Sequence, residues 1–199
     1  GREQIPLATP TSTLTDTPTA TPTFTPTPAN QPPAAIAGPD QTVNEGESVY
    51  LDASSSFDPD SDNLVYAWDL DNDGQYDDAS GVTTEINFPD NDVFTIGLRV
   101  TDEFGAYDID TVEINVMNVD PEIGSITAPI DPLQVGTIVQ TSAKFTDPGT
   151  ADTHSPLWDW GDGSTSSGMI LDYNISGSHI YTMPGVYTLS LTVTDDDGS

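Results

Sequence analysis

The feature that most constrains this chain is a strand-and-turn pattern that occurs twice, ninety positions apart. The later copy, Trp158–Gly163, reads Trp-Asp-Trp-Gly-Asp-Gly, in which a strand ends on an Asp-Gly turn. Apolar and polar residues then alternate from Tyr187 to Val193. The earlier copy has Trp68-Asp69 at the turn and a later apolar strand over 93–101. Alternation with a period of two is typical of a half-buried strand, and a repeat of this size corresponds to a whole β-sandwich domain.

The later copy resembles the signature of the polycystic kidney disease (PKD) domain. That family carries Trp-Asp-aromatic-Gly-Asp-Gly, then His-x-Tyr, then Pro-Gly-x-Tyr before a long strand. This chain has the three motifs in that order, at 158–163, 179–181 and 184–187. The resemblance implies an immunoglobulin-like β-sandwich built around the second copy.

The first copy is similar to the same family over 37–43 and 51–60. Its Phe57-Asp58-Pro59 corresponds to Thr146-Asp147-Pro148 in the second copy. It departs from the family pattern at 71–74, where a longer acidic loop replaces the short turn, and it lacks the His-x-Tyr pair. The resemblance therefore holds for both copies, with the second copy closer to the family pattern.

The resemblance covers about residues 32 to 199 and divides the chain into three parts. These are an extended Thr/Pro-rich segment at 1–31, a first PKD-like domain at 32–118 and a second at 119–199. The predicted fold class is all-β, with two immunoglobulin-like, PKD-type β-sandwiches in tandem. Because the connection at 119–121 is too short for a flexible linker, we expect the domains to stack end to end with restricted motion.

Clusters of Gly, Pro, Asp and Ser separate the apolar runs at the spacing of a sandwich. In the first domain, strands are predicted at 34–37, 41–43, 48–53, 64–69, 85–88, 93–101 and 111–117. In the second domain, they are predicted at 122–127, 137–145, 157–160, 169–173 and 186–193.

The second domain lacks its last strand in this sequence. In the first domain, the strand ending at Asp102 is followed by a turn and a final strand within 106–117, whereas the equivalent run 195–198 is followed by one residue. A missing strand exposes unpaired backbone and apolar side chains. Two explanations stay open: the polypeptide is a fragment of a longer chain, or another chain segment supplies the strand in trans.

The N-terminal segment is the candidate donor for the second explanation. Every odd position from Thr9 to Thr27 is threonine, and the even positions hold prolines together with Ser12, Leu14, Asp16, Ala20 and Phe24. In a β-extended chain, the threonines point one way and the apolar side chains the other. Head-to-tail donation gives a filament unless it closes into a ring. The strand-donor candidates are Ile5, Leu7 and Leu14.

The same threonine tract predicts a glycosylated stalk. Its repeat approximates Thr-Pro-Thr-x, and proline at this density favours an extended chain. Threonine hydroxyls beside proline are typical of O-glycosylated stalks, and a disordered linker is the alternative. Asn174-Ile175-Ser176 also matches an N-glycosylation acceptor. The predicted O-glycosylation sites are Thr9, Thr11, Thr13, Thr15, Thr17, Thr19, Thr21, Thr23, Thr25 and Thr27.

The charge balance restricts the partners of the chain. Lys and Arg total 3 against 33 Asp and Glu, which gives a formal net charge of -30. Nucleic acid and anionic membrane surfaces would be repelled, so neither is expected as a partner. No apolar run approaches the roughly 20 residues that span a bilayer, so membrane insertion is not expected either. Such charge also destabilises a folded domain, and bound divalent cations would relieve the repulsion.

One acidic loop has the spacing of a calcium site. Carboxylates alternate after Trp68 and a glycine follows at 74, which resembles the start of an Asp-x-Asp-x-Asp-Gly calcium loop. Ser80 stands where an EF-hand would have its bidentate Glu, and strands flank the loop, so the helical form of this motif is excluded. Calcium is therefore the expected cofactor. Its predicted ligands are Asp69, Asp71, Asp73, Gln75 and Asp77.

Other polar groups are interpreted structurally. Asp58-Pro59-Asp60-Ser61-Asp62 could hold a second calcium with Asp102, but it reads better as a turn with proline at its second position. His154 and His179 stand alone, and His179 is expected to pack and hydrogen-bond beside Tyr181. Asp159 and Asp162 form a carboxylate pair that the turn motif explains without catalysis. The chain is therefore not expected to be an enzyme.

The sequence supports two functional hypotheses. The first is a non-enzymatic extracellular or cell-surface protein of a prokaryote, a calcium-stabilised stalk or filament subunit whose partners are other copies of itself or neighbouring surface proteins. The alternative is a spacer or polysaccharide-binding accessory module of a secreted hydrolase or adhesin. An exposed Trp160 that retains the chain on chitin or cellulose would favour the alternative.

Overall fold

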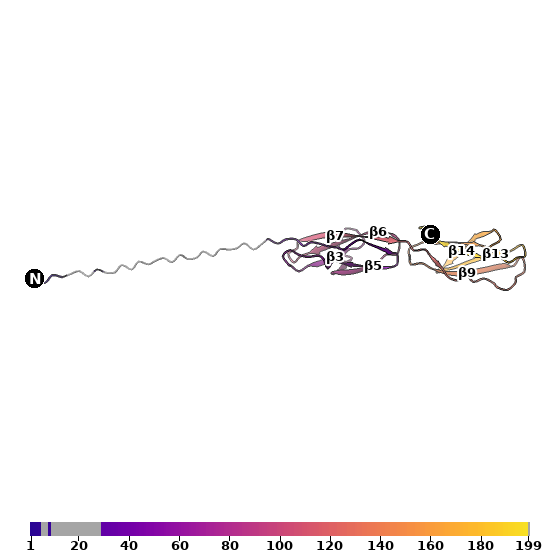
Figure 1. Cartoon of the computed structure of the whole chain (residues 1–199), viewed down its shortest axis with the longest axis horizontal. Helices are drawn as coiled ribbons and strands as arrows, with labels where there is room; N and C mark the ends of the chain where they lie inside the picture. The colour runs from indigo at the N-terminus through magenta and orange to yellow at the C-terminus, as the bar shows by residue number, and fades with distance from the viewer. Residues whose placement is uncertain (5–7, 9–28, 199) are drawn as a thin grey trace.

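The computed structural model describes residues 1–4, 8 and 29–198, and these residues hold strands and no helix (Figure 1). Two β-sandwiches lie end to end, with their junction near residue 118 (Figure 1). The all-β fold and the tandem arrangement predicted from the repeat are confirmed. Within the described residues, no helix exists that could cross a membrane.

The first sandwich pairs a large sheet with a small one. Its strands are β1 (Gln41–Asn44), β2 (Ser48–Asp52), β3 (Val65–Asp69), β4 (Ala79–Ser80), β5 (Thr83–Asn87), β6 (Asp92–Thr101) and β7 (Tyr107–Met117). The large sheet has the order β1-β7-β6-β3-β4, and β2 pairs with β5 in the small one. All ten residues of β6 are paired with β7, and β1 adds to the other side of β7 in parallel.

The core of the first sandwich follows from the alternation of its strands. Trp68 on β3 is fully buried, and its indole N–H donates to the Gly81 carbonyl at 3.0 Å. Ile96, Leu98 and Ile114 from the β6–β7 pair are also fully buried around the same core. Because alternate residues of a strand point to opposite faces, this set lies on one face of the large sheet.

The second sandwich is built from shorter elements. Its strands are β8 (Glu122–Ile123), β9 (Ile138–Thr146), β10 (Ser155–Asp159), β11 (Thr165–Ser167), β12 (Met169–Leu171), β13 (Asn174–Ile180) and β14 (Ser190–Thr194). They form a sheet of order β11-β10-β14 and a sheet of order β12-β13-β9-β8. The buried core is smaller than the first and centres on Trp158 and Trp160, whose rings stack with centroids 5.7 Å apart.

Several strand predictions were wrong in extent. The strand expected at 34–37 is reduced to a single bridge between Ala34 and Phe57. The short strands β4 and β11 were missed, as was β13, which contains a glycine and mostly polar residues. A Cβ on that residue, Gly177, would lie 2.5 Å from the Trp158 indole nitrogen, so the close approach of β13 to the core requires glycine.

The strand predicted at 186–193 was also wrong in extent, since β14 covers only Ser190–Thr194. In the first domain, the equivalent β6 is held over its whole length by β7. In the second, β14 has only the five-residue β10 beside it within the described part of the chain. The run from Val186 to Leu189 therefore has no strand to pair with.

The buried indole of Trp68 gives a test of the first core. We expect Trp68→Ala to lower the free energy of unfolding by about 3 to 5 kcal/mol, because it removes a large, fully buried side chain. Urea denaturation followed by circular dichroism measures this change. The matched control is Phe104→Ala on a turn, where the ring is 69% exposed; its effect should stay within about 0.5 kcal/mol. Equal effects of the two variants would contradict this description of the core.

Candidate functional site

The predicted calcium loop begins where β3 ends. Ligand oxygens of Asp69, Asp71 and Asp73 lie within 4.8 Å of one another, so the structure brings three of the five predicted ligands together. The Asp69 carboxylate is buried and accepts the backbone N–H groups of Asp73 and Gly74. These bonds shape the loop whether or not an ion is bound.

The other two predicted ligands, Gln75 and Asp77, stay predictions. Gln75 donates its side-chain amide to Asp73 at 2.7 Å, and Asp77 does not belong to the cluster of the three aspartates. Asp78 closes the loop instead, because its carboxylate accepts the N–H of Leu70. The three clustered carboxylates fit a hard cation such as calcium, with the remaining coordination open to water. Calcium at this loop stays a prediction.

The predicted glycosylation sites Thr9 to Thr27 lie outside the described residues. The same holds for the strand-donor candidates Ile5, Leu7 and Leu14. Asn174 of the predicted N-glycosylation tripeptide begins β13 and is exposed, and its amide donates to the carbonyls of Leu171 and Asp172.

The run 58–62 forms a turn, as predicted, and oxygens of Asp58, Asp60 and Asp62 also lie within 4.8 Å of one another. The Ser61 N–H donates to the Asp58 carbonyl at 3.1 Å, and one Asp58 carboxylate oxygen accepts the N–H groups of Asp60 and Asp62. Asp102 caps the turn that follows β6 and accepts the Asn30 side chain at 2.7 Å. The Asn30 hydrogen bond lowers the pKa of Asp102, which keeps this carboxylate ionised.

The Trp-Asp turn and the His-x-Tyr pair form one structural unit. His179 stacks on Trp160 with ring centroids 5.0 Å apart, and its Nε2 lies 2.8 Å from the Asp162 carboxylate. The Tyr181 hydroxyl donates to the Trp160 carbonyl at 2.8 Å. The interpretation of His179 as a packing and hydrogen-bonding residue is confirmed. Trp160 is fully buried, so the exposed tryptophan surface that polysaccharide binding would use is absent there.

The edge of β14 is the largest structural difference between the domains. In the described residues, nothing pairs with the side of β14 that β7 would occupy in the first domain. The segment 131–134 lies ninety positions after β1 and forms no strand. In the first domain, β1 is held by its parallel partner β7, and the second domain has no such partner in the described residues. In the first domain, β7 lies between β6 and β1. A missing counterpart of β7 therefore explains both the open edge of β14 and the missing counterpart of β1.

Apolar side chains also line a groove beside the segment that leads into β14. This groove of about 360 Å³ runs between the segment 128–137 and the segment 181–189, above Val139 of β9. Ile130 and Val186 on its rim are almost fully exposed, and Met183 is 67% exposed. This is the kind of surface that an added strand covers.

Sequence reasoning missed an acidic cluster at the junction between the domains. Oxygens of Glu45, Asp90 and Asp152 lie within 4.8 Å of one another, and so do those of Asp152, Asp196 and Asp197. Burial, followed by repulsion from Glu45 and the neighbouring aspartates, raises the pKa of Asp152 to about 6. The sequence shows only a large excess of acidic over basic residues. That excess does not predict which carboxylates come together in the fold.

Comparison with protein families gives one match that covers both domains. A family model described as PKD domain matches residues 30–116 and again residues 118–199. The first match ends at residue 116 and the second begins at residue 118, so the boundary between them coincides with the junction near residue 118.

Solved structures give more partial similarities. The PKD1 domain of Vibrio anguillarum Epp is 30% identical over 45% of this chain and 100% of that domain, with a TM-score of 0.35. A nucleoside hydrolase-related hypothetical protein from Saccharophagus degradans, associated with carbohydrate metabolism, is 25% identical, with a TM-score of 0.38. That match covers 45% of this chain and 26% of the other, so this chain spans about a quarter of that protein's length.

The Trp-Asp turn predicts a specific pH dependence. The Ser164 hydroxyl bond, followed by the His179 bond, lowers the pKa of Asp162 to about 2. A folded-state pKa below the ordinary value of 3.8 means that ionised Asp162 stabilises the fold above about pH 4. This stabilisation is lost as the pH falls to about 2.

We expect Ser164→Ala to move the pKa of Asp162 upward, toward its ordinary value, because the hydroxyl donor is removed. An NMR titration of the Asp162 side-chain carboxyl carbon measures the change. Ser167→Ala on exposed β11 is the control and should leave the titration unchanged. An unaltered Asp162 titration in the Ser164 variant would show that the hydroxyl bond does not set this pKa.

Proposed function

This chain belongs to the PKD domain family, and from that premise we propose that it is a non-enzymatic structural protein on the outside of a prokaryotic cell. In this proposal, the two sandwiches form the body of a stalk or filament subunit, and the Thr/Pro-rich segment is its glycosylated extension. The observation that carries the proposal is the open edge of β14, together with an apolar groove beside the segment that leads into this strand.

We propose that the open edge accepts the N-terminal segment of a second copy. An incoming strand would form backbone hydrogen bonds with the open edge of β14. It would also pack against the exposed segment around Ile130. Alternate side chains of that strand would face the sandwich, and the tract supplies them as Leu14, Ala20 and Phe24 at even positions. The threonines between them would then point outward and remain available for sugars.

The charge of the chain is consistent with this role. A formal net charge of -30 keeps sandwiches apart everywhere except where backbone pairing or a bound cation overcomes the repulsion. The proposal includes calcium at Asp69, Asp71 and Asp73, where it would neutralise part of this charge. The partners it implies are other copies of the chain or neighbouring surface proteins.

The proposal assigns no catalysis to the described residues. The chain has two histidines, and each one forms a hydrogen bond with an aspartate: His154 with Asp147, and His179 with Asp162. A spacer role beside a hydrolase or adhesin is compatible with the same fold. Binding of polysaccharide through tryptophan is not supported, because Trp68, Trp158 and Trp160 are all fully buried.

The test compares the mass in solution of residues 1–199 and 30–199, by size-exclusion chromatography with light scattering in calcium. We expect open-ended polymers from the longer chain only, and we expect a peptide of residues 1–29 to bind the shorter one. Monomers from both chains would contradict strand donation and would favour the alternative that this sequence is part of a longer chain that supplies its own last strand.

Paired substitutions test the parity of the donor segment. We expect Leu14→Asp with Phe24→Asp to abolish polymerisation, because these side chains face the acceptor sandwich in the proposed register. Thr13→Asp with Thr23→Asp adds the same charge on the outward face and should preserve it. Equal loss in the two double variants would show that charge, rather than strand register, controls assembly.

A further inference from the structure

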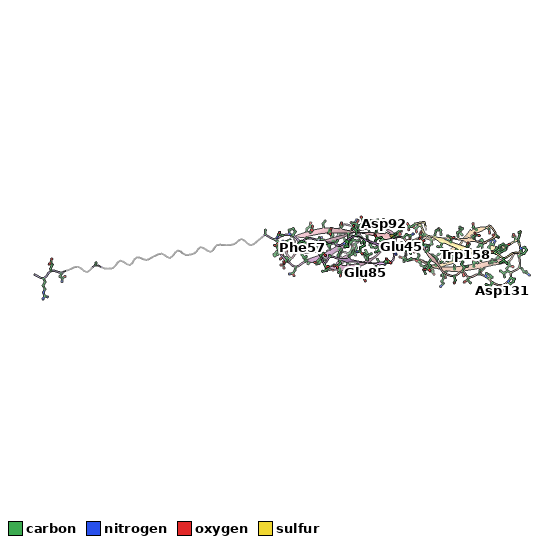
Figure 2. All side chains as sticks on the ribbon, in the orientation of Figure 1. Glu45, Phe57, Glu85, Asp92, Asp131 and Trp158 are labelled. Carbon is green, nitrogen blue, oxygen red and sulfur yellow. The ribbon has the colours of Figure 1, made fainter. Side chains whose placement is uncertain are left out.

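The junction between the two sandwiches holds carboxylates from both of them. Glu45 follows β1 and Asp90 precedes β6, so both come from the end of the first domain. Asp152, Asp196 and Asp197 come from loops of the second. The ligand oxygens of Glu45, Asp90 and Asp152 lie within 4.8 Å of one another across the domain boundary. Figure 2 shows Glu45 at this end of the first sandwich.

The carboxylates at the centre of this cluster are buried without a partner for their outer oxygens. Glu45 is 1% exposed; its Oε1 accepts the Val119 N–H at 2.8 Å, but its Oε2 has no hydrogen-bond partner. Both carboxylate oxygens of Asp152 are likewise buried and unbonded. A buried charge without a partner is strongly unfavourable, so these carboxylates require a hydrogen-bond donor, a proton or a cation.

No basic side chain of the described residues fills that need. Their only salt bridges are His154–Asp147 and His179–Asp162. His154 bonds Asp147 at 2.8 Å, and a ring nitrogen of His154 lies within 4.8 Å of an Asp152 oxygen, but no hydrogen bond joins His154 to Asp152. Asn91, with its amide nitrogen turned toward the acids, donates to Asp90 and Asp197 and leaves the oxygens of Glu45 and Asp152 unbonded.

The backbone leaves room for these oxygens to converge. A Cβ at Gly149 would overlap the Asp152 carboxylate and lie 2.7 Å from Glu45 Cδ. On the same interface, a Cβ at Gly46 would lie 2.9 Å from Pro148, and the Ala151 N–H donates to the Pro89 carbonyl at 3.1 Å. The two domains therefore touch directly, and glycine keeps the space between the carboxylates open.

We propose that Glu45, Asp90 and Asp152 bind one calcium ion that locks the two sandwiches together, with Asp196 and Asp197 on its second-domain side. Ligands of calcium lie about 2.3 to 2.6 Å from the ion, so any two of them are at most about 5 Å apart. The 4.8 Å limit on these oxygens fits that sphere. Glu45, Asp90 and Asp152 supply carboxylates alone, and the nearby His154 nitrogen bonds Asp147, so the set favours calcium over zinc. Its loop-borne geometry suits calcium better than the strict octahedron of magnesium.

The consequence is a cation-dependent joint. With the ion bound, ligands from both domains fix their relative orientation. Without it, the clustered negative charges repel one another across the junction. This inference concerns residues other than the predicted calcium loop at Asp69, and it does not depend on strand exchange between chains.

The first test is calcium titration of the full chain by isothermal calorimetry, using calcium chloride alone. We expect Glu45→Gln and Asp152→Asn to weaken one binding site at least tenfold. Asp131→Asn removes one charge from an exposed loop at the far end of the second domain and should leave that site intact (Figure 2). Gly149→Ala keeps every charge and should also weaken binding, because its methyl group enters the space of the ligands.

The second test separates a metal ligand from a purely structural side chain. In chelator, we expect Glu45→Gln and Asp152→Asn to melt at or above the temperature of the unaltered chain, because each removes a repelled charge. In calcium at a hundredfold excess over the dissociation constant, the unaltered chain should gain on the order of 10 °C, and the variants should gain clearly less, because they keep only the predicted site at Asp69. Structural residues would instead lower the melting temperature equally in both conditions.

The joint itself is tested by residual dipolar couplings of the two domains. We expect one common alignment tensor in calcium and two different tensors in chelator. The proposal is overturned if the chain binds no calcium, or if Glu45→Gln, Asp152→Asn and Asp131→Asn bind it alike. It is also overturned if the two domains share one tensor in chelator.

Discussion

The ladder of backbone hydrogen bonds between β6 and β7 is the interaction on which the first sandwich depends. It pairs all ten residues of β6, buries Ile96, Leu98 and Ile114, and gives β1 an edge to join. Where this ladder is missing, in the second domain, β14 shortens to five residues and the counterpart of β1 forms no strand. An apolar groove lies in the same domain, between the segments 128–137 and 181–189.

Electrostatic repulsion is the second constraint, and it acts on the junction. With 33 acidic residues against 3 basic ones, the chain cannot neutralise itself, and its described salt bridges involve histidines alone. The repulsion is strongest between the domains, where Glu45 and Asp152 have buried oxygens without a hydrogen-bond partner. A divalent cation there would relieve the repulsion and make the tandem rigid, which is a useful property for a stalk. In the proposed filament, strand exchange would join these units through the open edge of β14.

The two acidic sites differed in how far the sequence could reveal them. Asp69, Asp71 and Asp73 alternate along one loop, so local spacing was enough to bring them together. The approach of Glu45 to Asp152 joins residues from different domains, and no periodic pattern links them. Asp77 continues the alternation, but it is the Asp78 carboxylate that accepts the Leu70 N–H, so the role of Asp77 as a ligand stays a prediction.

The sequence by itself determined the fold class, the two-domain repeat and the packing role of His179, because these depend on local alternation and on motifs that recur ninety positions apart. Only the tertiary structure decided how long each strand is, since a strand such as β14 extends only as far as its neighbours pair with it. It alone also decided that Trp160 is buried and that the carboxylates of two domains converge. Both depend on contacts between segments far apart in the chain, which local patterns do not encode.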